Sequence, residues 1–404
     1  MTLDHAGKEE TLPWKDTSPV TERKKFIEDY LTGEFTVTEL CRKYGISRKT
    51  GHKWIRRFLD HCELTDRSSR PHRSPKAVPS WVEDAIVRAR RQKPRWGPRK
   101  LRDALLRANP GAEMPSVSTF ALIFRRNGLI RPKRRRRKAP PFSAPLAHAK
   151  APNQVWCIDF KGHFAVGTTR CHPLTITDAF SRFLIACVAL SRPDGQRVRK
   201  VMEQVFDEFG LPDAIRSDNG TPFASNGLGG LSEVSTWWWK LGIRHERIQP
   251  GKPQQNGRHE RMHLTLAQET ASPPSANLKA QQRAFDRFRK EYNHDRPHEA
   301  LGGNVPADYY QPSERPLPDP PWGRDFLYPD EFEIAQVSKL GYLQWNGRSA
   351  YVSSALAHQK LGLDWEDRRT WKVYFGRMLL GTLRRGPRGA LRFTATTASP
   401  TSMQ

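Results

Sequence analysis

Two short segments decide the fold expected of this chain: QVWCIDF at residues 154–160 and AIRSDNG at residues 214–220. The first is a short run rich in apolar residues and residues 214–217 of the second are predicted as another short strand; they end at Asp159 and Asp218 respectively. Further strands are predicted at 174–178 and 184–190, and helices at 198–209, 231–241, 257–270 and 277–292. Strands followed by helices in this order indicate an α/β domain, which we place at residues 151–311.

Three carboxylates are candidates for one site in this domain. Asp159 and Asp218 end strands, where α/β sheets place their ligands, and Glu260 lies in the first turn of the helix expected at 257–270. Glu260 shares one face of that helix with Leu264 and Ala267. Because those two residues are apolar, we expect this face to meet the sheet and Glu260 to point inward.

Each acid also has a simpler interpretation. An Asp before Asn-Gly is a common turn residue, a Glu in a first helical turn complements the helix dipole, and an Asp at a strand end is often only solvated. Taken together, in this order and on these elements, the three acids favour a metal site. Oxygen ligands suit Mg²⁺, and two such ions can clamp a phosphodiester during in-line displacement. The predicted cofactor is therefore Mg²⁺, with two ions expected and Mn²⁺ able to substitute.

The charge of the chain points to the partner. Lysines and arginines number 68 against 42 aspartates and glutamates, which gives a net charge of +26 and a pI of about 10.2. Such a field attracts polyanions, of which nucleic acid is the commonest large one in a cell. No apolar run approaches the roughly 20 residues that span a bilayer, and residues 1–10 have no apolar secretory region. Five scattered cysteines fit a reducing compartment. We expect a cytoplasmic, nucleoid-associated protein with no membrane partner.

A helix-turn-helix unit is predicted at residues 19–62, after a disordered leader at 1–18. Thr36 and Glu39 form a capping box, Gly45 stops that helix, and Ser47 can cap the next one. The second helix presents a basic face that suits the DNA major groove; its candidate DNA-binding residues are Arg48, Lys49, His52, Lys53 and Arg56. The alternative is a plain helical hairpin with a solvated basic face.

A second helix-turn-helix-like unit is expected at residues 75–131, with helices at 81–92, 98–108 and 117–127. Ser80 and Glu83 are interpreted as another capping box. A basic and proline-containing linker follows at 132–150. It includes the run Arg134, Arg135, Arg136 and Arg137, which is either a solubilising linker or, as we prefer, an arm that binds phosphates and reaches a minor groove.

The last segment is predicted to be a small β-barrel at residues 325–392. Asn346-Gly347, between 342–345 and 348–352, is typical of a type I′ hairpin turn. A second hairpin is expected to turn at Gly376-Arg377. The complete fold class is therefore multidomain: helix-turn-helix units, an α/β core, then a small β-barrel.

Three further motifs carry a resemblance to a known family. RSDNGTPFAS (216–225), IQPGKPQQNGRHERMHLTL (248–266) and YNHDRPHEALGG (292–303) resemble the integrase-type catalytic core of bacterial insertion-sequence transposases, which are relatives of retroviral integrases. The similarity covers residues 151–311. It implies a ribonuclease-H-like core in which Asp159, Asp218 and Glu260 are the catalytic and metal-binding triad.

The resemblance also implies a reaction and its partners. The enzyme would be a polynucleotidyl transferase that cuts DNA at the ends of its element and joins the freed 3′-OH to target DNA. Its partners would be double-stranded DNA, both terminal inverted repeats and target, and further copies of itself in a dimer or higher oligomer. Lys252, Asn256 and Arg258 lie just before Glu260 and are candidate DNA contacts, although Asn256 could equally cap the helix.

Two alternatives remain at the level of sequence. One is a sequence-specific DNA-binding regulator whose nuclease-like domain is inactive. The other is a metal nuclease of the same fold that cuts DNA without joining it.

Overall fold

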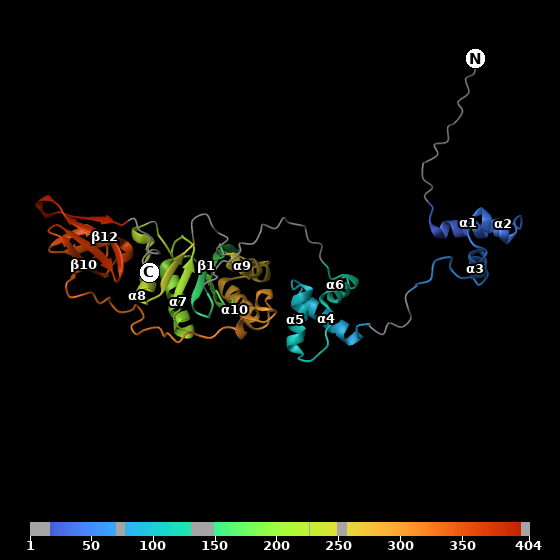
Figure 1. The fold of residues 1–404 in the computed structure, drawn as a ribbon, viewed down its shortest axis with the longest axis horizontal. Helices are drawn as coiled ribbons and strands as arrows, with labels where there is room; N and C mark the ends of the chain where they lie inside the picture. Colours follow the sequence, from blue (N-terminus) through green and yellow to red (C-terminus); the bar gives the residue numbers. More distant parts are fainter. Residues whose placement is uncertain (1–16, 70–76, 131–148, 226, 249–256, 397–404) are drawn as a thin grey trace, which may run out of the picture. The chain divides into compact units, whose positions relative to one another are not determined.

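The computed structural model describes residues 17–69, 77–130, 149–225, 227–248 and 257–396, and its backbone divides into two compact units, 1–77 and 78–404 (Figure 1). The first unit holds the helices α1 (Pro19–Leu31), α2 (Val37–Lys43) and α3 (Arg48–Leu59). The second holds three more helices, an α/β domain and a seven-stranded sheet. None of the described helices is long and apolar enough to cross a membrane.

The first unit is the predicted helix-turn-helix. The capping box is confirmed, because the Thr36 N–H donates to Glu39 Oε2 at 2.8 Å while the Thr36 side chain accepts from the Glu39 N–H. A small core forms from Phe26, Ile27, Leu40, Cys41 and Ile55. Gly51 is required here, since a Cβ at this position would lie 2.5 Å from Cys41 Sγ.

The three helices after residue 77 match the predicted ranges closely: α4 (Ser80–Gln92), α5 (Pro98–Ala108) and α6 (Val117–Arg126). The second capping box is wrong. Ser80 is already the first helical residue, Pro79 precedes it without any side-chain cap, and Glu83 accepts from Asn127 and pairs with Arg126 on α6. The acid is therefore used to join α4 to α6 rather than to cap its own helix.

The α/β domain contains the predicted strands and two that the sequence did not indicate. Its strands are β1 (Val155–Phe160), β2 (Phe164–Val166), β3 (Thr169–Asp178), β4 (Leu184–Leu190), β5 (Ala214–Ser217) and β6 (Arg244–Arg247). β3 pairs with β1 and β4 antiparallel, whereas β5 lies parallel between β1 and β6. β6 escaped prediction because its sequence, RHER, is charged.

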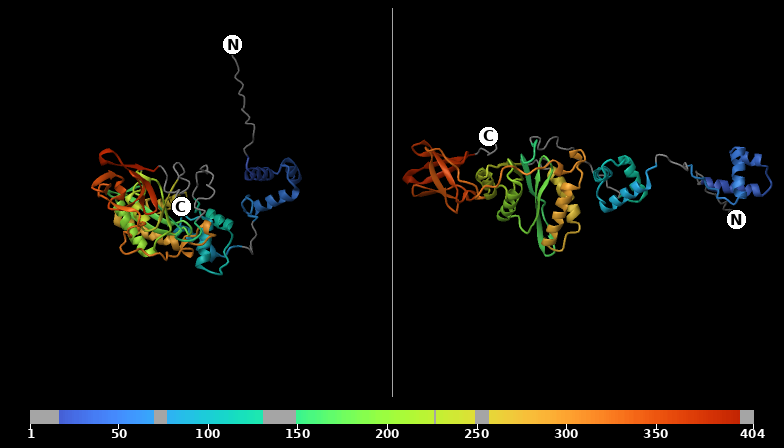
Figure 2. Two further views of the ribbon diagram at one scale, coloured as in Figure 1. Left: turned by 60° about the vertical axis from the view of Figure 1, so that its left-hand side comes forward. Right: turned by 90° about the horizontal axis from the view of Figure 1, so that it is seen from below.

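Helices cover both faces of this sheet (Figures 1 and 2). Strand β4 contributes to both sides: Ile185 packs with α7 (Gly195–Phe209) and α8 (Glu233–Lys240), whereas Leu184 and Cys187 pack with α9 (Gly257–Thr270) and α10 (Leu278–His294). A strand buried on both faces reads as a continuous apolar run, as the sequence of β4 does.

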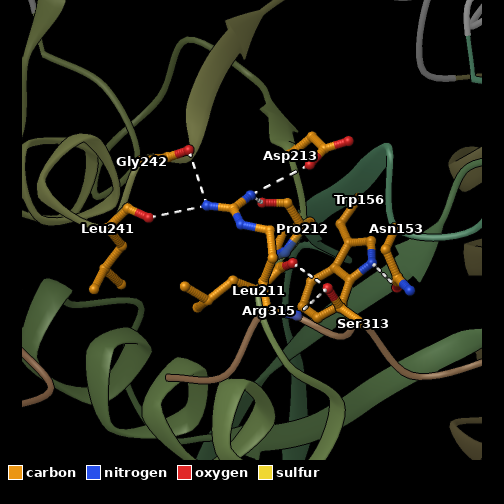
Figure 3. A network of polar contacts seen from close by, with 9 residues as sticks. All are labelled: Asn153, Trp156, Leu211, Pro212, Asp213, Leu241, Gly242, Ser313 and Arg315. Carbon is orange, nitrogen blue, oxygen red and sulfur yellow. Dashed lines mark hydrogen bonds and ion pairs between the residues drawn. The ribbon is translucent and has the colours of Figure 1, made fainter. Parts of the chain in front are cut away.

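The proline-rich segment after residue 311 is held on the α/β domain by an arginine (Figure 3). The Arg315 guanidinium donates to the carbonyls of Pro212, Leu241 and Gly242 at 2.9–3.2 Å. Ser313 adds a bond from Oγ to the Leu211 carbonyl at 2.7 Å. The segment is thus fastened to the α/β domain along its path.

The last domain is a nearly closed antiparallel barrel, as predicted. Its seven strands run in the order β13-β12-β11-β10-β7-β8-β9, and the edge strands β13 and β9 lie close together. Their bounds are β7 (Glu333–Val337), β8 (Tyr342–Trp345), β9 (Arg348–Tyr351), β10 (Lys360–Asp367), β11 (Thr370–Phe375), β12 (Met378–Arg385) and β13 (Leu391–Ala395). Asn346 and Gly347 both have positive φ, 48° and 69°, as a type I′ turn requires.

Removing the Arg315 side chain tests the role of this fastening. We expect Arg315→Ala to destabilise the segment by about 1–3 kcal/mol, because three carbonyls lose a charged donor. Limited proteolysis should then cut faster between residues 311 and 325, with fragments identified by mass spectrometry. Arg324→Ala, an exposed change on the same segment, is the matched control. Equal cleavage rates in both variants would contradict the assignment.

Candidate active site

Asp159 sits at the end of β1 on the face that α9 covers. It pairs in register with Thr175 of β3, and its side chain is largely buried. Burial, together with the carboxylates of Asp218 and Glu260, raises the pKa of Asp159 to about 7. The Phe160 N–H and the Lys161 charge act in the opposite direction. The effect of the two other acids shows that all three share one electrostatic environment.

The strand register accounts for the position of Asp218. β1 and β5 are parallel, with Val155 opposite Ala214 and Cys157 opposite Arg216. The paired register stops two residues before each aspartate, and Asp218 directly follows the last residue of β5. Because neighbouring strands lie about 4.8 Å apart, the pairing places the two aspartates at the same end of adjacent strands.

Asp218 begins the loop that follows β5, and its side chain is exposed. The Gly220 N–H donates to Asp218 Oδ1 at 3.2 Å. The loop is fixed by the Asn219 side chain, which donates to the Ile248 carbonyl at 2.7 Å and accepts from Arg247 Nε at 2.8 Å. The turn motif therefore serves to present this carboxylate at the surface.

Glu260 was expected to point toward the sheet, and this prediction is wrong. Its helix α9 does meet the sheet, but with the face that carries His259, Met262, His263 and Leu266, while Glu260 and Leu264 are exposed. In the sequence, the apolar Leu264 and Ala267 indicated the face that would meet the sheet. The helix instead turns its histidines toward the sheet, because threonine hydroxyls of the sheet form hydrogen bonds with both rings. Glu260 still lies near enough to raise the pKa of Asp159.

Sequence reasoning missed a buried polar cluster beside Asp159. His259 Nε2 and His263 Nε2 lie 2.6 and 2.7 Å from Thr175 Oγ1, and His259 Nδ1 lies 3.0 Å from Thr177 Oγ1. Burial lowers the pKa of His259 to about 3 and that of His263 to about 2, so both rings are neutral. The signal was present in the sequence as two histidines four residues apart on one helix.

A carboxylate and two imidazole rings gather here, and these are groups that divalent cations take as ligands. Asp159, His259 and His263 each place a ligand atom within 4.8 Å of the others. Two further carboxylates repel the Asp159 charge, and a cation would relieve that repulsion. Hard carboxylate oxygens are the donors that Mg²⁺ and Mn²⁺ take.

The predicted basic face of the first unit is present on α3. Its side chains are exposed at all five predicted positions, while Gly51, Trp54 and Ile55 face the core; the exposed residues are Arg48, Lys49, His52, Lys53 and Arg56. The Lys53 ammonium lies 4.4 Å from the Trp54 ring centre, which holds this side chain against the helix.

Other predicted DNA contacts cannot be placed. Arg134, Arg135, Arg136 and Arg137, together with Lys252 and Asn256, lie outside the described residues. Only the backbone of Arg258 is described, at the start of α9. These residues stay predictions.

Protein-family models match four segments of the chain. Residues 149–253 and 241–306 each match an integrase core domain model, residues 22–72 a helix-turn-helix domain, and residues 50–123 a homeodomain-like domain. The chain therefore carries an integrase core domain. The resemblance seen in the three sequence motifs is thereby confirmed, together with the ribonuclease-H-like fold class.

Two relatives come from insertion elements. The chain is 29% identical over 270 residues to the "Insertion element IS476 uncharacterized 39.2 kDa protein" of Xanthomonas euvesicatoria, covering 63% of this chain and 75% of that one. It is 28% identical over 226 residues to the "Insertion element IS407 uncharacterized 31.7 kDa protein" of Burkholderia multivorans, covering 55% and 78%. A stretch of 118 residues is 33% identical to the Pol polyprotein of feline endogenous virus ECE1, covering 28% of this chain and 10% of that polyprotein. These relatives support a general role in transposition and DNA integration.

The pKa of Asp159 predicts a pH-dependent stability. In the metal-free protein this carboxyl stays protonated up to about pH 7, against 3.8 when exposed. Its contribution to stability is complete below about pH 4 and is lost as the pH rises through about 7. Asp159→Asn, which cannot ionise, should therefore raise the melting temperature more at about pH 7.5 than at about pH 4.5.

Thermal unfolding in EDTA measures this difference. Asp207→Asn, an exposed change on α7, is the control and should show no such pH dependence. The same shift at both pH values for Asp159→Asn would mean that the aspartate does not titrate near neutrality.

Proposed function

We propose that this protein is a transposase that cuts DNA at the ends of its element and joins them to target DNA. The observation that carries the proposal is the grouping of Asp159, Asp218 and Glu260, whose charges act on one another at one edge of an integrase-type core. Asp159, Asp218 and Glu260 would be the catalytic and metal-binding residues. The cofactor would be Mg²⁺, with two ions expected and Mn²⁺ as a substitute.

The chemistry would be two in-line displacements at phosphorus. In the first, a water oxygen bonds to phosphorus as the bond to the 3′-oxygen breaks, leaving a 3′-OH. In the second, that 3′-OH attacks a target phosphodiester and displaces its 3′-oxygen. Bound Mg²⁺ would activate the attacking oxygen and stabilise the leaving one.

The protein's own part is to hold charge and position. The parallel pairing of β1 with β5 supports this role, because it fixes the two strands that lead to Asp159 and Asp218 before any ligand arrives. The Asn219 bonds keep the Asp218 loop in place. Positioning of this kind supplies much of the catalysis in phosphoryl transfer, where the protein makes no covalent intermediate.

The helical units would recognise the terminal inverted repeats. Support comes from the exposed basic face of α3 and from the helix-turn-helix and homeodomain-like matches. Joining two element ends to one target calls for two or more copies of the chain, so we propose a dimer or higher oligomer acting on double-stranded DNA in the cytoplasm.

The catalytic prediction concerns Asp218→Asn. This change keeps the size and the bond from Gly220 but removes a metal-binding charge. We expect cleavage and joining of a labelled element-end duplex to fall at least about 100-fold in Mg²⁺ and in Mn²⁺. Asp207→Asn, exposed and remote on α7, should retain wild-type rates.

The products separate the candidate functions. Nicking at the repeat boundary together with joined products, both lost in Asp218→Asn and in EDTA, supports a transposase. Nicking without joining would indicate a nuclease of the same fold. Specific binding without cleavage in any metal, unchanged by Asp218→Asn, would reject both and leave a DNA-binding regulator.

A second prediction concerns the α3 surface. If Arg56 contacts a phosphate, Arg56→Gln should weaken binding to every sequence and reduce the slope of log K against log salt concentration by about 1. Lys24→Gln, an exposed change on α1, is the charge-matched control. Fluorescence anisotropy at several salt concentrations measures the slope. An unchanged slope for Arg56→Gln would exclude this residue from the phosphate contacts.

A further inference from the structure

Two buried histidines lie beside Asp159 on the face of α9 that meets the sheet. His259 and His263 are one helical turn apart on α9, and both face the sheet with 2% and 6% of their surface exposed. The segment HERMH, residues 259–263, has the His-Glu-x-x-His spacing by which helices hold a metal with two histidines. The hydrogen bonds around the two rings decide which nitrogens are free to do so.

Thr175 fixes the protons on both rings. Its hydroxyl donates its one hydrogen to the Asp159 carbonyl at 3.1 Å. The Thr175 oxygen can then only accept, and it takes a hydrogen from Nε2 of His259 and from Nε2 of His263, at 2.6 and 2.7 Å. Each ring therefore carries a hydrogen on Nε2.

His259 has no nitrogen left for a metal. Its Nδ1 accepts from the Thr177 hydroxyl at 3.0 Å, while its Nε2 is held by Thr175. The ring joins two strand residues to α9 and acts as a support. The two-histidine site that the spacing indicates is therefore incomplete.

His263 differs from His259 at Nδ1. This atom takes part in no hydrogen bond among the described residues and faces Asp159 Oδ2 at 3.9 Å. That separation is too long for an N–H to O bond. Two metal–ligand bonds of about 2.1 Å can span up to about 4.2 Å, so one ion fits between the two atoms.

We propose that His263 is a further ligand of the catalytic metal ion, which it binds through Nδ1 beside the Asp159 carboxylate. The inference rests on the proposed function in that it adds to the same metal site. The Nε2–H to Thr175 bond is the orienting contact that metal-bound histidines usually make with their other ring nitrogen.

A nitrogen ligand changes which metal the site prefers. Mg²⁺ binds oxygen donors and gains little from imidazole, whereas Mn²⁺ accepts imidazole nitrogen more readily. The wild-type protein should therefore bind Mn²⁺ more tightly than Mg²⁺ by a margin that depends on His263.

The experiment uses the full chain with Mn²⁺ and records pulsed electron paramagnetic resonance, which detects ¹⁴N bonded to the ion. We expect nitrogen modulation in the wild type, its loss in His263→Gln, and its retention in His259→Gln. The glutamine amide at 263 can still donate to Thr175, so the substitution removes the Nδ1 lone pair and keeps the orienting bond. Labelling the wild type with ¹⁵N-histidine must alter the modulation, and this needs no substitution.

Calorimetry separates a ligand from a positioning residue. If His263 is a ligand, His263→Gln should weaken Mn²⁺ binding roughly 10- to 100-fold and Mg²⁺ binding far less. Equal weakening for both metals, or no nitrogen modulation in the wild type, would overturn the proposal. Joined products without nitrogen modulation would reject this inference alone, and nitrogen modulation without DNA cleavage would reject only the proposed function.

Discussion

The parallel pairing of β1 with β5 is the constraint on which the candidate site depends. It holds side by side the two strands that lead to Asp159, which is largely buried, and to Asp218, which is exposed. Burial raises the pKa of Asp159, and repulsion by the Asp218 carboxylate adds to this effect. This arrangement favours the binding of a cation, because the positive charge of the ion removes the repulsion between the carboxylates.

The rest of the domain maintains this arrangement from both faces. Aromatic and aliphatic side chains from α7 and α8 pack on one side, and α9 and α10 pack on the other. The cluster of Thr175, Thr177, His259 and His263 lies on the second side, directly behind Asp159. Both threonine hydroxyls and three of the four ring nitrogens in this cluster are hydrogen-bonded, which makes it a rigid support.

Much of this architecture could be predicted from the sequence. Apolar runs of strand length, a capping box at Thr36 and an Asn346-Gly347 turn each have a local physical cause, and the structure has them where they were expected. The errors share one origin. Local propensity was used to predict the cap at Ser80, the orientation of Glu260 and the absence of a strand at β6. In the structure these features depend on contacts with distant parts of the chain. The orientation of α9 in particular depends on two threonines about 85 residues earlier, which helical periodicity cannot reveal.

The central claim is that Asp159, Asp218 and Glu260 hold a divalent metal together. The most direct measurement is the anomalous scattering of crystals of the full-length protein grown with Mn²⁺, recorded at the manganese absorption edge. The account predicts an anomalous peak within bonding distance of the Asp159 and Asp218 carboxylates and adjacent to Glu260. A peak bound elsewhere, or no peak at these residues when Mn²⁺ is in excess, would contradict it.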